Sequence, residues 1–158
     1  MIIDESGGTI EALPQALSDG YVGTSHKNCK GVIKGIAAAC LIRKRQFSDS
    51  GSRLVLSAED LSITGPIALA HDLAVIAELG IIHAERNGHH YFRGLSAWPG
   101  TVQASLLLKY PDVYFSHPRG FVAVKVERGV ISIRSIKQGF GGEPDHQLRG
   151  FLASFLTS

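Results

Sequence analysis

The apolar and polar positions of the chain alternate between the spacing of strands and the spacing of helices. Short apolar runs predict four strands, at 1–3, 21–25, 53–56 and 81–84. Thr9 is a residue type that caps helices, and Pro66 is typical of a first helical position. Together with apolar residues that recur at every third or fourth position, they predict helices at 9–18, 32–46 and 66–79. This part of the chain is therefore interpreted as repeated strand–helix units.

After residue 98 the regular alternation of strand and helix patterns ends. A helix is expected at 101–109, and apolar runs at 121–126 and 130–136 flank Glu127-Arg128-Gly129, which predicts a β-hairpin. A glycine-rich turn at 139–142 precedes a final helix that opens at Pro144 and carries three apolar residues on one face, namely Leu148, Leu152 and Phe155. This second part is therefore expected to hold a helix, a hairpin and a terminal helix.

Strands that alternate with helices usually pair in parallel, through right-handed crossovers. A complete (β/α)₈ barrel of roughly 250 residues uses about 31 residues for each unit. Residues 1–98 hold about four such units, which predicts the C-terminal half of a TIM barrel, and residues 99–158 would complete its contacts. A small, complete doubly wound sheet is the alternative interpretation of residues 1–98.

The composition of the 158 residues fits a folded domain, because 44% of them are apolar and 19% are charged. A net charge of +2 is too small for a general binder of nucleic acids or of membrane surfaces. No apolar run is long enough to cross a membrane, and no signal peptide is evident. With Cys29 and Cys40 as the two cysteines, a reduced, cytoplasmic protein is expected.

Ionisable side chains follow each predicted strand: Asp4, Lys27, Glu59 and Glu85. Parallel strands bring their carboxyl ends to one edge, so these groups are expected there together. The pair Asp4-Glu5 suits a divalent cation that prefers oxygen ligands, or it complements the dipole of the next helix. Lys27 and Lys30 suit proton transfer if they are desolvated, or they are solvated loop lysines.

Three histidines have no assigned chemistry. His89 and His90 are adjacent and lack the spacing of a transition-metal site, so a structural role or a contact with substrate is expected. His26 precedes Lys27 and has no predicted role. The glycine-rich segment at 139–142 has no lysine of the kind found in phosphate-binding loops.

Taken together, these residues resemble the C-terminal barrel half of the enolase superfamily, in its mandelate racemase and muconate lactonizing branch. Asp4-Glu5-Ser6 is similar to the end of that family's fifth strand. Lys27-Asn28-Cys29-Lys30-Gly31 resembles its Lys-x-x-Lys-x-Gly-Gly motif, although here a glycine follows the second lysine directly. The segments 57–60 and 83–88 fall at the seventh and eighth strand ends. Gln138-Gly139-Phe140-Gly141 is similar to the family's Pro-Gly-Leu-Gly, with glutamine in place of proline.

The resemblance implies a fold, a metal and a reaction. The intact parent would remove the proton next to a substrate carboxylate while Mg²⁺ stabilises the enolate, as a racemase, cycloisomerase or dehydratase. By the same resemblance Asp4 is a magnesium ligand with Glu5 beside it. The catalytic lysine is Lys27. The further acid–base candidates are Lys30, Glu59 and Glu85.

Several parts of the family pattern are missing from the chain. The strands that carry the other magnesium ligands, the second base and the N-terminal capping domain have no counterpart. We therefore expect the chain to be inactive alone, to begin at Met1 where a longer protein was cut, and to associate with a second copy or with the missing half. The alternatives are a metal-dependent enzyme active as a homodimeric barrel, and a non-catalytic α/β module that binds a small ligand.

Overall fold

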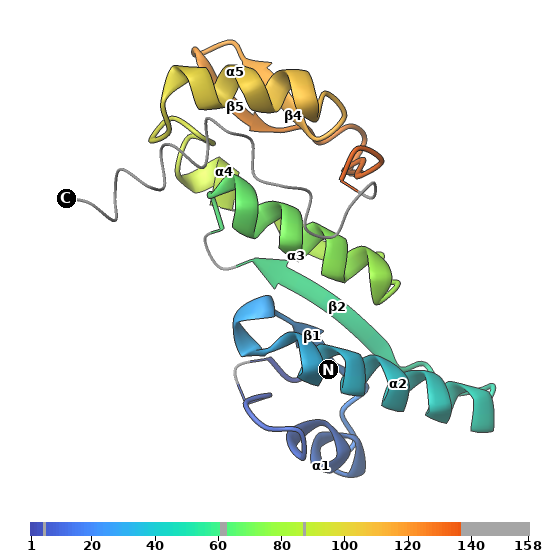
Figure 1. Cartoon of the computed structure of the whole chain (residues 1–158). Coiled ribbons are helices and arrows are strands. Elements are labelled where there is room, and N and C mark those ends of the chain that lie inside the picture. The colour runs from blue at the N-terminus through green and yellow to red at the C-terminus, as the bar shows by residue number, and fades with distance from the viewer. Residues whose placement is uncertain (5, 61–62, 87, 137–158) are drawn as a thin grey trace. The chain divides into compact units, whose positions relative to one another are not determined.

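The computed structural model describes residues 1–4, 6–60, 63–86 and 88–136 (Figure 1). Its helices and strands, in chain order, are α1 (Ala12–Ser18), β1 (Gly23–His26), the 3₁₀ helix η1 (Asn28–Lys30), α2 (Val32–Ser48), β2 (Val55–Asp60), α3 (Pro66–Glu78), β3 (Ala84–Arg86), α4 (Gly88–Tyr91), α5 (Gly100–Lys109), β4 (Tyr114–His117) and β5 (Phe121–Val124). In the part that the structure describes, every helix is too short or too polar to cross a membrane.

The chain divides into two compact units. Unit 1 comprises Met1–Asp60 and Val75–Arg86, and unit 2 comprises Leu61–Ala74 and Asn87–Ser158. Helix α3 contributes residues to both units, so each unit is described by itself. The division at residue 98 that the sequence suggests stays a prediction.

Unit 1 contains a parallel sheet with the strand order β1-β2-β3. Gly23 pairs with Val55 at the start of the β1–β2 ladder, and Glu59 pairs with Glu85 in the β2–β3 ladder. The predicted strand at 1–3 contributes one parallel bridge, from Ile3 to Thr24. The α/β class and the parallel order of consecutive strands are thus confirmed, and the described residues form no closed barrel.

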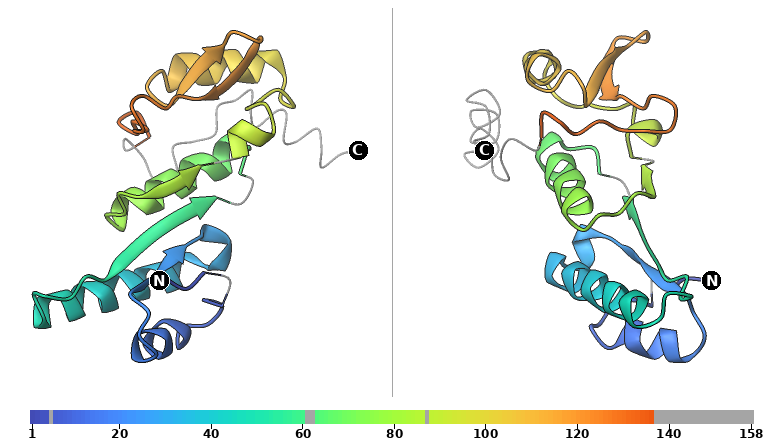
Figure 2. Two further views of the ribbon diagram at one scale, coloured as in Figure 1. Left: turned by 180° about the vertical axis from the view of Figure 1, so that it is seen from behind. Right: turned by 90° about the vertical axis from the view of Figure 1, so that its right-hand side faces the viewer.

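Two glycines let the elements of unit 1 approach one another closely. Gly23 has φ of 152°, and a Cβ atom there would lie 1.8 Å from the carbonyl oxygen of Val55. Gly35 lies in α2, where a Cβ atom would be 2.4 Å from Nδ1 of His26. Helix α2 can therefore run along the sheet (Figure 2) directly above the His26 ring, which is 4% exposed. His26 also shares a 2.9 Å hydrogen bond with Oδ1 of Asn28.

The predicted helices of unit 1 are present, and so are its predicted strands apart from 1–3, which contributes only one bridge, but some of the boundaries are wrong. Helix α1 begins after Glu11, without a side-chain cap, so Thr9 is not the cap residue. Strand β2 extends to Asp60, beyond the predicted end. The strand expected at 81–84 lies at 84–86, because the Ile81 amide donates to the carbonyl of Ile76 and so completes the C-terminal turn of α3.

Unit 2 is organised around an apolar core. Leu95 and Val113 are fully buried, and Leu69 of α3 is 1% exposed. The other buried members of this cluster are Leu73, Val102, Leu106, Tyr114, Val122 and Ile136. Helices α3 and α5 and the β4–β5 pair therefore each contribute one apolar face, as the amphipathic spacing of the helices predicts.

The hairpin of unit 2 differs from the predicted one. Strand β5 pairs in antiparallel fashion with β4, and the turn that joins them contains Gly120 with φ of 81°. The predicted turn at 127–129 is present, with positive φ at Arg128 and Gly129, but it closes only one bridge, from Glu127 to Val130. Because β4 takes up the pairing of β5, no strand forms among the described residues 130–136. The predicted turn at 139–142 and the final helix lie outside the described residues.

Candidate functional site

Unit 1 gathers four of the predicted site residues at the carboxyl ends of its parallel strands. Asp4 follows the bridge that Ile3 makes to β1, and Lys27 directly follows β1. Lys30 ends the 3₁₀ helix η1, and Glu59 lies near the end of β2. The parallel register explains the convergence, because it aligns the ends of neighbouring strands.

Lys27 lies at the centre of this cluster. Its side chain is 2% exposed, and its Nζ atom is 3.1 Å from Oδ1 and 3.3 Å from Oδ2 of Asp4. The same Nζ atom is 3.4 Å from Oε1 of Glu59, whose side chain is 22% exposed. A buried ammonium group is stable only with such partners. The interpretation of Lys27 as a solvated loop lysine is therefore wrong.

Lys30 contacts Asp4 from a second direction. Its Nζ atom donates to the carbonyl oxygen of Asp4 at 2.7 Å and to Oδ1 at 2.8 Å. Its side chain is also largely buried, at 14% exposed. The two lysines therefore fix both the backbone and the carboxylate of Asp4.

Ser25 completes the cluster and is missing from the residues selected from the sequence. Its Oγ atom is 2.6 Å from Oδ1 of Asp4 and 2.7 Å from Oε1 of Glu59. A hydroxyl group has one proton, so it donates to one of these carboxylates at a time. The signal that was available is positional, because Ser25 lies two residues before Lys27 and the side chains of an extended segment share a face at that spacing.

The electrostatic environment stabilises the ionised form of Asp4. Partial burial acts to raise the pKa of Asp4, but the hydrogen bonds from Lys30, Ser25 and Lys27 outweigh it and hold the pKa well below its usual range. With Asp4 and Glu59 as carboxylates and the two lysines as ammonium groups, the described charges of the cluster balance.

The remaining site candidates lie elsewhere or outside the described part. Glu85 lies opposite Glu59 in the β2–β3 register, and its side chain is exposed to solvent. Glu5 falls outside the described residues. His89 lies in α4 of unit 2, where its Nδ1 atom accepts a 3.1 Å hydrogen bond from the amide of Val124, and the expectation of a structural role or a substrate contact stays a prediction. His90 lies in the same helix and is exposed.

The described residues do not by themselves fit a magnesium ion. Lys27 and Lys30 donate hydrogen bonds to the two carboxylate oxygens of Asp4, so ammonium groups occupy the positions at which this carboxylate would bind a metal ion. Mg²⁺ also requires several oxygen ligands in octahedral geometry. Within the described ranges, no group of three histidine, cysteine or acidic residues is placed to bind a metal. An ion at this edge would need ligands that the described residues do not supply.

Comparison of the chain with protein-family models, with curated proteins and with solved structures gives no match. Any family or activity is therefore proposed from the residues themselves.

Proposed function

We propose that unit 1 carries part of a proton-transfer site of the enolase-superfamily kind. In this proposal Lys27 exchanges a proton with the carbon next to a substrate carboxylate, and Lys30, Glu59 and Glu85 are the further acid–base groups of the intact protein. The observation that supports it most is the convergence of Asp4, Lys27 and Glu59 at the ends of parallel strands. Metal-assisted enolate chemistry would come with Mg²⁺ in the complete protein, where Asp4 and Glu5 would share the ligand set with residues absent from this chain.

The geometry also explains why we propose that the chain alone is inactive. Carboxylates at 3.1 and 3.4 Å favour the ammonium form of Lys27, which donates a proton and does not accept one. Lys30 competes for the same carboxylate of Asp4. A base at this position therefore needs an added positive charge nearby, such as the Mg²⁺ that the complete protein would hold, because a cation favours the neutral form of a lysine.

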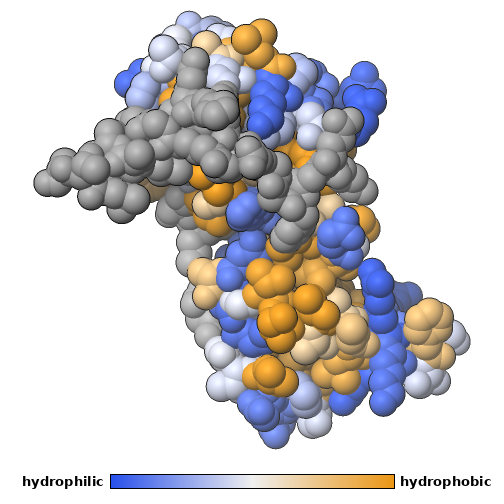
Figure 3. Space-filling model, in the orientation of Figure 1, coloured by the Kyte–Doolittle hydropathy of each residue, from blue (hydrophilic) through white to orange (hydrophobic). Residues whose placement is uncertain are grey.

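We further propose that the chain associates through its sheet edges with a second copy or with the missing half of the barrel. Residues 1–4 and β3 form the two edges, and within the described residues no further strand pairs with either. Unpaired edges favour pairing with another chain. An apolar patch over the N-terminal half of α2, which exposes Val32, Ile33 and Ile36, adds surface that a partner would cover (Figure 3).

The DNA upstream of the Met1 codon tests the proposal directly. We expect an in-frame extension that encodes strands ending in Asp or Glu. The protein expressed from that longer frame should exchange the α-proton of a carboxylate such as mandelate for deuterium when Mg²⁺ is added. Lys27→Met should abolish the exchange, whereas Lys44→Met on the exposed side of α2 should not. A stop codon directly upstream would contradict the proposal that a longer enzyme exists.

A second candidate, a metal-dependent enzyme active as a homodimeric barrel, is favoured by the same open edges. It requires a dimer in sedimentation velocity and heat of Mg²⁺ binding in isothermal titration. A stable monomer at high concentration, or no binding at millimolar metal, would remove this candidate.

A further inference from the structure

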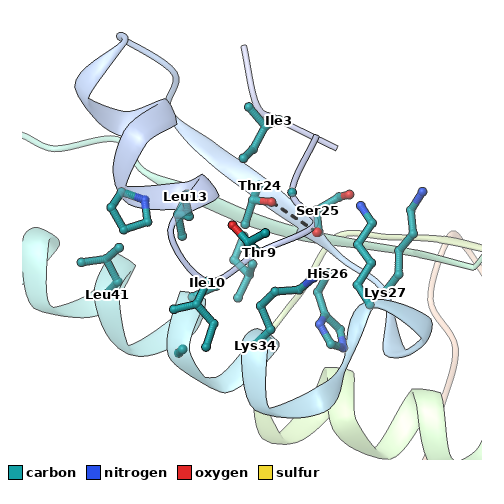
Figure 4. A pocket seen from close by; sticks show the side chains of 17 residues that line it. Ile3, Thr9, Ile10, Leu13, Thr24, Ser25, His26, Lys27, Lys34 and Leu41 are labelled. Atoms are coloured by element: carbon teal, nitrogen blue, oxygen red, sulfur yellow. Dashed lines mark hydrogen bonds between the residues drawn. The ribbon is translucent and has the colours of Figure 1, made fainter. Parts of the chain in front are cut away.

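Unit 1 contains a cavity on the helix-covered side of its sheet. The cavity has a volume of about 190 Å³ and lies between α1, α2 and β1 (Figure 4). Its wall is largely apolar, with Ile3, Ile10, Leu13, Ala38, Leu41 and Leu56 among its residues. An apolar cavity of about 150 Å³ is large enough to bind benzene. This one therefore has room for one aromatic ring or a short aliphatic chain.

The apolar wall is incompletely covered by the protein itself. Ile10 lines the cavity and is 57% exposed, whereas Leu13, one turn further along the chain, is 6% exposed. Apolar surface that stays in contact with water favours binding of an apolar group. A ligand that fills the cavity would cover Ile10.

One positive charge on the wall differs from the others. Lys27 and Lys30 also line the cavity, but both are bound to carboxylates of the strand-end cluster. Lys34 donates to the carbonyl oxygen of Gly8 at 3.0 Å, and no carboxylate among the described residues pairs with it. Figure 4 shows its side chain extending from α2 towards the segment that holds Thr9, whose hydroxyl group also lines the wall. Lys34 is therefore an ammonium group of the wall that no described carboxylate neutralises.

We propose that this cavity binds a small monocarboxylate. The apolar body of the ligand fills the space between α1 and α2, and its carboxylate accepts hydrogen bonds from Lys34. A charged carboxylate suits this position because charge-assisted hydrogen bonds are the stronger kind, and because Lys34 keeps further protons to donate after its bond to Gly8. The proposal does not require the proton-transfer function, because the carboxylate is assigned to Lys34, which lies outside the strand-end cluster, although Lys27 and Lys30 of that cluster also line the cavity.

Benzoate and benzyl alcohol are suitable probes, because they share a ring and differ in charge. Each is titrated into the ¹⁵N-labelled full chain while amide shifts are followed by NMR. We expect benzoate to bind with a dissociation constant of about 1 mM and to shift the amides of α1 and α2. Benzyl alcohol should bind about tenfold more weakly, because it gains nothing from the ammonium group.

Three variants separate charge from volume. Lys34→Met should weaken benzoate about tenfold and leave benzyl alcohol unchanged, whereas Lys34→Arg should retain benzoate binding. Ala38→Leu fills the cavity and should abolish binding of both probes. Lys44→Met, on the exposed side of the same helix, should change neither. The proposal is overturned if benzoate fails to bind, if Lys34→Met binds it as tightly as the original chain, or if Ala38→Leu still binds it.

Discussion

Asp4 in unit 1 and Asp112 in unit 2 are both carboxylates whose pKa lies below its usual value, but the two units achieve this by different means. Asp4 is held by two ammonium groups and one hydroxyl. Asp112 accepts hydrogen bonds from the hydroxyl of Ser132 at 2.6 Å, from the amide of Ser135 and from the hydroxyl of Ser135. Burial acts to raise the pKa of Asp112, and these neutral donors lower it to about 2.

The difference shows that a lowered pKa does not by itself identify a functional site. The partners of Asp112 are three residues apart in one loop and carry no charge, so they fasten that loop to the segment after α5. The partners of Asp4 include two ionisable side chains, Lys27 directly after β1 and Lys30 in η1, beside the hydroxyl of Ser25 in β1. Only the second arrangement brings lysine and carboxylate side chains together at the ends of parallel strands, which is why we place the proposed function in unit 1.

The largest effect should come from removing the buried charge of unit 1. Lys27→Met removes the ammonium group that contacts both Asp4 and Glu59 and leaves Lys30 to contact Asp4, and removing one member of a buried ion pair costs about 3 kcal/mol. Amide hydrogen exchange measured by mass spectrometry should show β1 and β2 losing protection, while β4 and β5 keep theirs. Lys44→Met is the matched control. A loss below about 1 kcal/mol, typical of a surface pair, would contradict the central role of Lys27.

A smaller loss of stability is expected when Asp112, which is held by neutral hydrogen-bond donors in unit 2, loses its charge. Asp112→Asn preserves the shape of the side chain but removes its charge. Because hydrogen bonds to a charged group contribute about 2 kcal/mol, the free energy of unfolding of unit 2 should fall by up to about 2 kcal/mol. The single tryptophan, Trp98, packs against the core of unit 2, so its fluorescence in urea reports on this unit. Glu127→Gln should leave the midpoint unchanged, since the Glu127 side chain is 71% exposed. An equal shift in both variants would show that Asp112 is an ordinary surface acid.

The stabilising contribution of Asp112 should also appear in the pH dependence of the free energy of unfolding. Because the pKa is about 2 in the folded chain and near 3.8 without its partners, the stabilisation is complete above pH 4 and is lost as the pH falls towards 2. The Trp98-detected free energy of unfolding should decline by about 1–2 kcal/mol over this window. In Asp112→Asn this part of the decline should disappear. A decline of the same size in the variant would assign the acid sensitivity to other groups.

The sequence predicted the elements of unit 1 better than those of unit 2. Parallel strands and their helices follow from apolar spacing, although residues 1–3 contribute only one bridge. The start of β3 was wrong because the hydrogen bond from Ile81 to Ile76 closes the turn that follows α3. Strand β4 was missed. Its four residues follow a proline-containing turn and show little alternation, and the register with β5 is set by the turn at Gly120. Short antiparallel strands depend on such tertiary pairing more than on local pattern.

The charged members of the candidate site could be predicted, and its neutral members could not. Topology alone places Asp4, Lys27 and Glu59 at one edge, since each follows or ends a parallel strand. Ser25 has no distinguishing chemistry, and the donors to Asp112 lie in a loop whose course is set by packing. Hydroxyl groups serve so many structural purposes that only coordinates show which of them contact a carboxylate.

The smallest effect, and the sharpest distinction between the two carboxylates, should come from salt. Mobile ions screen charged partners far more than neutral ones, and at about 1 M salt the screening length falls to about 3 Å. The Asp4 side chain is 39% exposed, so the attraction of Lys27 and Lys30 is open to screening, whereas the donors of Asp112 carry no charge. Carbon-detected NMR titrations at low and high sodium chloride should therefore show the pKa of Asp4 rising towards its usual value, while that of Asp112 stays near 2. If salt changed the two pKa values equally, the lysines would act on Asp4 through hydrogen-bond geometry and not through their charge. The contrast between charged partners at Asp4 and neutral partners at Asp112 would then not hold.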